Sequence, residues 1–216
     1  MGIAAAETII AWQSHEGPRI ARAHGHDIIH CVMCGFRHVV PLPDAGSFEH
    51  TYKDVYARGP NPVVLFNPGE DEAWMEVAHG DLLESFERLQ PSLSHRRLLD
   101  IGSGPGFFLK TAKSRGWKVL GIEPSPTAST HARGMGIEVA EGFFNAETAP
   151  GLGRFDAVQL NNVLEHVPYP TETLLLARDL LDSGGILSVN VPNDFSPFQV
   201  AARAPPAAQT TRTREI

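Results

Sequence analysis

The stretch LLDIGSGPGFF, residues 98–108, places an apolar run directly before three glycines at positions 102, 104 and 106. A short apolar run that stops at a turn signal is typical of a buried strand, and the amphipathic segment after it is typical of a helix. Between a strand and a helix, glycines let a ligand lie against the backbone and face the amides of the helix N-terminus. The stretch therefore predicts an α/β fold with a ligand-binding turn after its first strand.

The spacing of these glycines separates two classes of ligand. The dinucleotide pattern G-x-G-x-x-G requires a glycine at position 107, where this chain has Phe107. The spacing here is G-x-G-x-G and ends at Gly106. Binding of a pyrophosphate is therefore disfavoured, and a nicotinamide-dependent oxidoreductase is the less favoured enzyme class.

After residue 91, short apolar runs alternate with amphipathic segments, as in a wound α/β sheet. Ser125 and Pro126 supply the N-cap and the first residue of one helix, and Gly184 and Gly185 predict a turn before the last strand. The expected strands span 97–101, 118–123, 137–142, 155–162 and 186–192. Upstream, a helix over 71–89 is expected to bury one face, made of Trp74, Val77, Ala78, Leu82 and Phe86.

The charge balance is acidic, with 18 Lys and Arg against 25 Asp and Glu and a formal net charge of −7. This balance argues against a protein that holds nucleic acid by neutralising phosphates. No segment resembles a signal peptide, and none approaches the ~20 apolar residues that span a bilayer. We therefore expect a cytoplasmic protein that acts on a small molecule, without nucleic acid or membrane as a partner.

The motif acid-x-G-x-G-x-G, from Asp100 to Gly106, resembles the first motif of the class I S-adenosylmethionine-dependent methyltransferases. The resemblance covers about residues 98–197 and is greatest to the small-molecule branch that includes the ubiquinone-biosynthesis O-methyltransferases. It implies a Rossmann-like, mostly parallel sheet in which the strands of this chain have the order 3-2-1-4-5. It also implies S-adenosylmethionine as the cofactor and an O, N or C nucleophile of a small molecule as the methyl acceptor.

Glu123 ends the second expected strand, about 20 residues after the glycines, where a carboxylate can bind both hydroxyls of a ribose. The resemblance implies the same role. It also implies that Asp100 lies near the amino end of the methionine part and that Gly102 and Gly104 line the methionine and ribose. The adenine pocket is expected at residues 142–144, with Phe143 or Phe144 covering the purine. The full set of cofactor-binding residues implied is Asp100, Gly102, Ser103, Gly104, Gly106, Glu123, Pro124, Gly142, Phe143, Asn161 and Asn162.

The segment NNVLEHVPYP, residues 161–170, follows the fourth strand, at the edge where open α/β sheets place their chemistry. His166 is a candidate general base for a substrate hydroxyl, because its ordinary pKa lies near neutrality, and Glu165 is its neighbour. Some relatives carry E-x-x-E-H here and bind a divalent metal, but Asn162 replaces the first carboxylate, which weakens the case for metal. In the alternative interpretation, Glu165 and His166 only cap or orient a short helix.

The N-terminal segment gathers cysteine and histidine. Cys31 and Cys34 are spaced as half of a zinc site, and nearby histidines could complete it, as a four-cysteine segment does at the start of some sugar C-methyltransferases. Because a second cysteine pair is missing, we expect a hairpin in which Cys31 and Cys34 are free thiols and bind no zinc. The neighbouring histidines are His24, His26, His30 and His38.

The family fold has seven strands, but this chain supplies five by our count. The 24 residues after Pro192 offer no run for strands six and seven, so these strands are expected to be missing and residues 201–216 to form an irregular or disordered tail. The fifth strand would then be an exposed edge that invites self-association. A cofactor-binding but inactive module is therefore the alternative function. The expected parts are a Cys/His unit with its connector over 1–66, a methyltransferase domain over 67–200 and the tail.

Overall fold

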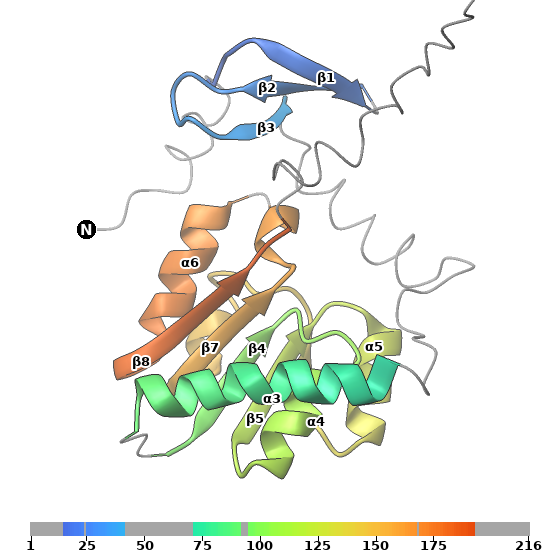
Figure 1. Ribbon diagram of the computed structural model, residues 1–216, viewed down its shortest axis with the longest axis vertical. Helices are drawn as coiled ribbons and strands as arrows, with labels where there is room; N and C mark the ends of the chain where they lie inside the picture. The colour runs from blue at the N-terminus through green and yellow to red at the C-terminus, as the bar shows by residue number, and fades with distance from the viewer. Residues whose placement is uncertain (1–14, 24, 42–70, 92–94, 168, 193–216) are drawn as a thin grey trace, which may run out of the picture.

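A computed structural model of the chain describes residues 15–23, 25–41, 71–91, 95–167 and 169–192. These residues form a three-stranded sheet and a five-stranded sheet that share no strand (Figure 1). The expected connector and tail lie outside the described residues. The part boundaries expected after residues 66 and 200 therefore stay predictions.

The larger sheet is parallel throughout, in the order β6-β5-β4-β7-β8. In chain order this is 3-2-1-4-5, so the predicted Rossmann-like α/β fold class is confirmed. Because all five strands run the same way, their carboxyl ends meet at one edge, and the glycine turn after β4 lies on that edge. The strands are β4 (Arg97–Ile101), β5 (Lys118–Glu123), β6 (Val139–Glu141), β7 (Phe155–Asn161) and β8 (Leu181–Asn190).

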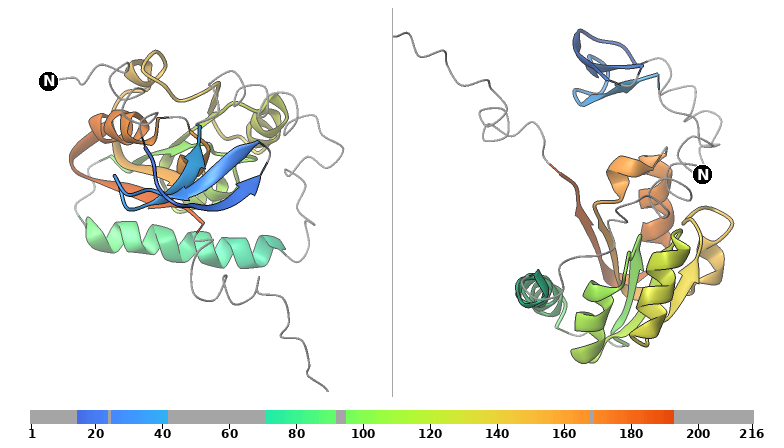
Figure 2. Two further views of the ribbon diagram at one scale, coloured as in Figure 1. Left: turned by 90° about the horizontal axis from the view of Figure 1, so that it is seen from above. Right: turned by 90° about the vertical axis from the view of Figure 1, so that its right-hand side faces the viewer.

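Helices cover both faces of this sheet (Figures 1 and 2). On one face lie α3 (Asp71–Leu89), α4 (Phe107–Ser114) and α5 (Pro126–Gly134), and on the other lie α6 (Pro170–Asp179) and the 3-10 turn η2 (Ala149–Gly151). Within the described part of the chain, no helix combines the length and the hydropathy needed to span a membrane.

The predicted N-cap of α5 is confirmed, because the Ser125 side chain accepts a hydrogen bond from the Ala128 amide at 3.3 Å. The predicted turn at Gly184 and Gly185 is wrong. β8 already begins at Leu181 and continues through both glycines, which lie where its register against β7 shifts. Gly184 has φ +79°, so the glycines serve an irregularity inside the strand rather than a turn before it.

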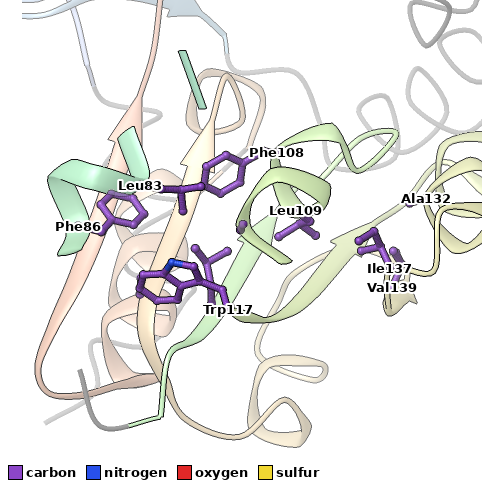
Figure 3. Close-up of a cluster of buried hydrophobic side chains, with 11 residues drawn as sticks. Leu83, Phe86, Phe108, Leu109, Trp117, Ala132, Ile137 and Val139 are labelled. Carbon is purple, nitrogen blue, oxygen red and sulfur yellow. The ribbon is translucent and has the colours of Figure 1, made fainter. Parts of the chain in front are cut away.

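The core beneath α3 and α4 joins Leu83 and Phe86 of α3 to Phe108, Leu109 and Trp117 (Figure 3). The expected buried face of α3 is therefore partly wrong. Phe86 is buried and Leu82 packs against the cluster, but Trp74 and Val77 are 72% and 64% exposed. The half of α3 that contributes to the cluster is its C-terminal half.

The smaller sheet is antiparallel, with β2 (His26–His30) between β1 (Arg19–Ala23) and β3 (Arg37–Val40). A tight turn, 31–36, joins β2 to β3. In it the Cys31 amide donates to the Phe36 carbonyl at 2.9 Å, and the Gly35 amide donates to the Cys31 carbonyl at 3.0 Å. These two hydrogen bonds close the turn that contains both cysteines.

At the other end of the large sheet, β8 pairs with β7, and among the described residues no strand pairs with its second edge. Val189 in β8 and Val191 just after it are 41% and 46% exposed. The segment after residue 192, in which we expected no sixth or seventh strand, lies outside the described residues. Self-association through β8 therefore stays a prediction.

Candidate active site

Backbone hydrogen bonds, both to β5 and within the turn, fix the glycine turn after β4. The amides of Gly102 and Ser103 both donate to the Ile122 carbonyl, at 2.8 and 3.2 Å, and the Gly106 amide donates to the Ser103 carbonyl at 3.1 Å. Gly102, Gly104 and Gly106 have φ values of +71°, +53° and +86°. Each therefore has a left-handed backbone that side chains disfavour, which explains glycine at every second position.

The space around the three glycines differs. A Cβ atom on Gly102 would lie 2.5 Å from the Val163 side chain, and one on Gly106 would lie 2.8 Å from the Ala132 side chain. A Cβ atom on Gly104 would meet no atom within 4 Å in the part of the chain that the structure describes. Gly102 and Gly106 thus allow close packing within the protein, whereas Gly104 opens onto the space that a ligand would use.

Glu123 lies beside this space and is only 8% exposed. One carboxylate oxygen accepts from the Gly104 amide at 2.9 Å and the other from the Ser125 amide at 2.8 Å. Burial raises the pKa of Glu123 more than these two hydrogen bonds lower it. Each carboxylate oxygen can accept more than one hydrogen bond, so a ligand hydroxyl can add to the amides already bound.

Asp100 is the second buried acid at this edge and is 4% exposed. Burial, together with the charge of Glu123, raises the pKa of Asp100 to about 8. Its register partners are Gly121 on β5 and Gln159 on β7, and Gln159 is buried with an Oε1 atom that accepts no hydrogen bond among the described residues. Two carboxyl groups that repel each other in a dry site would both be stabilised as anions by a cationic ligand.

Other predicted cofactor residues lie around Glu123. The Gly142 amide donates to the Glu123 carbonyl at 3.0 Å, and Pro124 and Phe143 are half-buried. The Ser103 hydroxyl faces into the fold, because a Cβ atom on Gly121 would lie 2.4 Å from it. Ser103 can therefore serve a ligand through its backbone only.

Of the two phenylalanines after β6, Phe144 packs against the buried cluster on the α6 face. The Phe143 carbonyl accepts from the Thr148 hydroxyl at 2.9 Å. This hydrogen bond fixes the backbone of the loop next to Gly142. Phe143 is thus the better placed of the two for a role beside a purine.

The end of β7 brings a second set of predicted residues to the same edge. The Asn161 side chain accepts from the Asn190 side chain at 2.9 Å, and the Asn162 amide donates to the Asn190 carbonyl at 2.8 Å. Asn162 has φ +53°, and Val163 packs over Gly102. Sequence reasoning missed Asn190 and Val163, because pairing across strands and packing across loops leave no local pattern.

The candidate base and its neighbour lie on the short 3-10 turn η3 (Leu164–His166). Nε2 of His166 is 3.7 Å from a carboxylate oxygen of Glu165, and the His166 side chain is 48% exposed. The imidazole ring therefore stays open to an acceptor while it lies beside a carboxylate. The η3 turn is also the short helix of the alternative interpretation, so both roles stay predictions.

The hollow lined by Arg97, Lys118 and Phe155 lies at the amino ends of the strands, on the opposite edge from the glycine turn. It contains none of the predicted site residues. By the rule that open α/β sheets bind ligands at the carboxyl ends of their strands, we assign the site to the glycine edge.

The smaller sheet holds Cys31 and Cys34, which are not joined in a disulfide. The pKa of the Cys31 thiol is lowered to about 7, because burial, which raises it, is outweighed by hydrogen bonds from backbone and side-chain groups that include His38. His26 instead contacts the Pro41 carbonyl at 2.8 Å. His24 lies outside the described residues.

A family model described as a methyltransferase domain matches residues 74–213, more than half of the chain. The chain therefore belongs to the methyltransferase domain family. This match confirms the resemblance to methyltransferases that is based on the motif from Asp100 to Gly106.

Curated relatives agree with this family. The chain is 38% identical over 141 residues to a ubiquinone biosynthesis O-methyltransferase from Caulobacter sp. (strain K31), covering 61% of this chain and 54% of the relative. It is 34% identical over 104 residues to the protein of the same name from Nitrosococcus oceani, covering 45% and 44%. The chain thus spans about half the length of the curated relatives it matches.

One similar solved structure is an S-adenosylmethionine-bound amino pentose methyltransferase from Micromonospora echinaspora involved in calicheamicin biosynthesis. It is 22% identical, with a TM-score of 0.48, and covers 60% of this chain and 58% of its own.

Proposed function

We propose that this chain binds S-adenosylmethionine at the glycine turn and transfers its methyl group to a nucleophile of a small molecule. The observation that carries the proposal is the pairing of Gly104 with Glu123. The carboxylate of Glu123 is anchored by the Gly104 amide at 2.9 Å, and the space above Gly104 is open. An anchored carboxylate beside open backbone suits a ribose diol.

The residues of the site also suit the charge of this cofactor. S-adenosylmethionine carries a sulfonium and an ammonium group, and when bound it supplies an electrophilic methyl group. Asp100 and Glu123 are both buried, and burial raises the pKa of each. A cation beside them would stabilise the two anions, so binding and ionisation should reinforce each other.

The protein's own part in the reaction is mainly positioning, because the electrophile needs little activation. Asn161 and Asn162 flank the methionine end in this proposal, and their hydrogen bonds to Asn190 fix the loop. His166 takes the proton from an acceptor hydroxyl, and the Glu165 carboxylate lies 3.7 Å from its Nε2 atom. Without the first carboxylate of the E-x-x-E-H pattern, no metal is needed in this scheme.

The class of acceptor is part of the proposal. The curated relatives are named for O-methylation in ubiquinone biosynthesis, which supports a small-molecule hydroxyl as the acceptor. The net charge of −7 is consistent with an acceptor other than nucleic acid. His166 is needed only where the acceptor must lose a proton.

Calorimetric titration of the full chain with S-adenosylhomocysteine, and separately with NADH, tests the cofactor. We expect binding of the first and none of the second. Glu123→Ala should raise the dissociation constant about 5- to 150-fold, the equivalent of roughly 1–3 kcal/mol, because the ribose hydroxyls lose their acceptor. Glu138→Ala, at an exposed glutamate before β6, is the matched control and should bind as the unaltered chain does.

Methyl transfer from labelled S-adenosylmethionine to a panel of small phenols, amines and carbon acids tests the reaction. His166→Gln should lower the rate with a phenol about 10²- to 10⁴-fold and leave the affinity for S-adenosylhomocysteine unchanged. If the unaltered chain binds the cofactor but methylates nothing in the panel, the binding-only alternative is supported and the activity is rejected. Tighter binding of NADH would reject the cofactor itself.

A further inference from the structure

Four side chains of the smaller sheet converge, although one of them, His15, lies 16 residues before the next in the sequence. His15 precedes β1, Cys31 and Cys34 lie in the turn between β2 and β3, and His38 lies in β3. One ligand atom from each, two sulfurs and two ring nitrogens, lies within 4.8 Å of all the others. The cluster is distinct from the glycine edge and takes no part in the proposed methyl transfer.

Two distances within the cluster are close to those of a tetrahedral metal site. Nδ1 of His15 is 3.2 Å from Nε2 of His38 and 3.4 Å from Sγ of Cys31. Zinc bonds of about 2.0–2.3 Å to nitrogen and sulfur place neighbouring ligand atoms about 3.3–3.8 Å apart in a tetrahedron. A small adjustment of side chains would therefore admit an ion.

The backbone fixes His15 beside the cysteine turn. The Val32 amide donates to the Glu16 carbonyl, and the His30 amide donates to the Pro18 carbonyl, both at 3.0 Å. Between them, a Cβ atom on Gly17 would lie 2.0 Å from the His30 carbonyl oxygen. The segment before β1 can approach the turn this closely only because residue 17 is glycine, and that approach delivers His15 to Cys31.

The groups around the ligands orient them for a metal. Nδ1 of His38 lies 3.1 Å from the Val39 carbonyl, which can only accept a hydrogen bond. Nδ1 therefore carries the proton, and Nε2 presents a lone pair to the cluster. The backbone amides of Met33 and Cys34 are hydrogen-bonded to the Cys31 sulfur, which fixes the position of this sulfur in the turn.

The smaller sheet also needs stabilisation that its core does not provide. Its strands have only four or five residues. Among its described residues, Ile29 and Cys31 are the buried apolar side chains, whereas Val32, Met33 and Phe36 are 67–71% exposed. Units of this size commonly depend on a disulfide or a metal, and here the two cysteines are not bonded to each other.

We propose that His15, Cys31, Cys34 and His38 bind one zinc ion that holds the smaller sheet together. Two thiolates and two imidazoles in a tetrahedron are a preferred zinc set, and the two negative sulfurs balance the divalent charge. Binding displaces the thiol protons to solvent. Because the protein fills all four positions, the site is structural, with no open position for a substrate.

This proposal departs from the expectation of two free thiols. That expectation considered four nearby histidines, His24, His26, His30 and His38, and not His15. His30 is exposed, and His26 faces the Pro41 carbonyl instead of the cluster. His15 lies 16 residues before Cys31, so no local spacing could identify it.

Elemental analysis of the purified full chain is the first test, and we expect about one equivalent of zinc. His15→Asn and Cys34→Ser should each lose it. His30→Asn is the matched control, because His30 is the exposed neighbour of Cys31, and this variant should retain the full equivalent. Binding of S-adenosylhomocysteine by each variant shows whether the larger sheet is intact, and it makes failure of this site distinguishable from failure of the proposed function.

Replacement of zinc by cobalt in the unaltered chain tests the ligands without any substitution. The intense visible absorption of tetrahedral cobalt, with a charge-transfer band from thiolate, is the expected spectrum. A chain that is purified without zinc and takes up neither metal on titration would overturn the proposal. Full zinc retention by His15→Asn would overturn the assignment of His15, even if the cysteine variant loses the metal.

Discussion

The glycines of the turn after β4 serve two purposes: Gly102 and Gly106 allow close packing within the protein, and Gly104 leaves space for a ligand. We predict that Gly104→Ala weakens binding of S-adenosylhomocysteine at least about tenfold while costing only about 1–2 kcal/mol of folding stability. The added methyl group meets no atom of the described residues within 4 Å, although the φ of +53° makes it mildly strained. Titration calorimetry and urea unfolding measure the two effects.

Two other glycines provide the controls for this prediction. Gly134→Ala also meets nothing within 4 Å, and its φ is not positive, so both binding and stability should change little. Gly102→Ala should instead lose more stability than Gly104→Ala, because its methyl group would lie 2.5 Å from Val163. Unchanged affinity in Gly104→Ala would mean that the ligand does not lie over this residue.

The raised pKa of Asp100 predicts how folding stability depends on pH. Burial raises its pKa from 3.8 to about 8, so between these values the native chain holds a proton that the unfolded chain has released. Stability should therefore fall as pH rises through this window, by up to about 1.4 kcal/mol per pH unit for one proton. Asp100→Asn should flatten the dependence and be more stable than the unaltered chain near the upper end of the window.

Urea unfolding at several pH values across this window measures the effect of Asp100→Asn. Some slope should remain in the variant, because burial also raises the pKa of Glu123. Equal slopes for the variant and the unaltered chain would show that Asp100 is ionised in the native state. Saturating S-adenosylhomocysteine should reduce the slope of the unaltered chain if its ammonium group lies near the two acids.

At the scale of the element, two substitutions on α3 test which of its residues pack against the core. Leu83→Ala should cost about 2–5 kcal/mol, because Leu83 is fully buried in the cluster with Phe108 and Trp117. Val77→Ala on the same helix should change stability by less than about 0.5 kcal/mol, since Val77 is 64% exposed. Urea unfolding measures both, and similar costs for the two variants would contradict the assigned face.

The same helix shows what the sequence could and could not predict. The bounds of α3 match the expected range 71–89, because helix formation and capping are local. Its buried face was only partly predicted, because Trp74 and Val77 have the right periodicity but lie on the half that does not contribute to the cluster. Periodicity defines a stripe along a helix but not how far a neighbouring element covers it.

The residues of the two candidate sites can also be separated into those that the local sequence predicted and those that it missed. The turn after β4 and Glu123 were predicted because each follows directly from its strand. Asn190, Val163 and His15 were missed because each reaches its partner through tertiary structure, across a strand pair, a loop contact or a chain crossing. A pattern that depends on two distant segments leaves no spacing in either of them.

At the scale of the whole molecule, the two sheets share no strand, so their stabilities can be separated. The smaller sheet has few buried apolar residues and, in our proposal, depends on zinc, whereas the larger sheet has two buried clusters of its own. A metal that binds only the folded form contributes its binding energy to folding. Removal of zinc by a chelator should therefore unfold the smaller sheet and leave the larger one folded.

We predict that chelation leaves the affinity for S-adenosylhomocysteine within about twofold of its original value, because the residues proposed to bind the cofactor lie in strands of the larger sheet or in the loops that follow them. Exchange of amide hydrogens should rise in β1, β2 and β3 but not in β4 or β7. Exchange should return to its original level when zinc is restored. Equal loss of protection in both sheets on chelation would show that the smaller sheet stabilises the larger one, and the chain would then unfold as one cooperative unit.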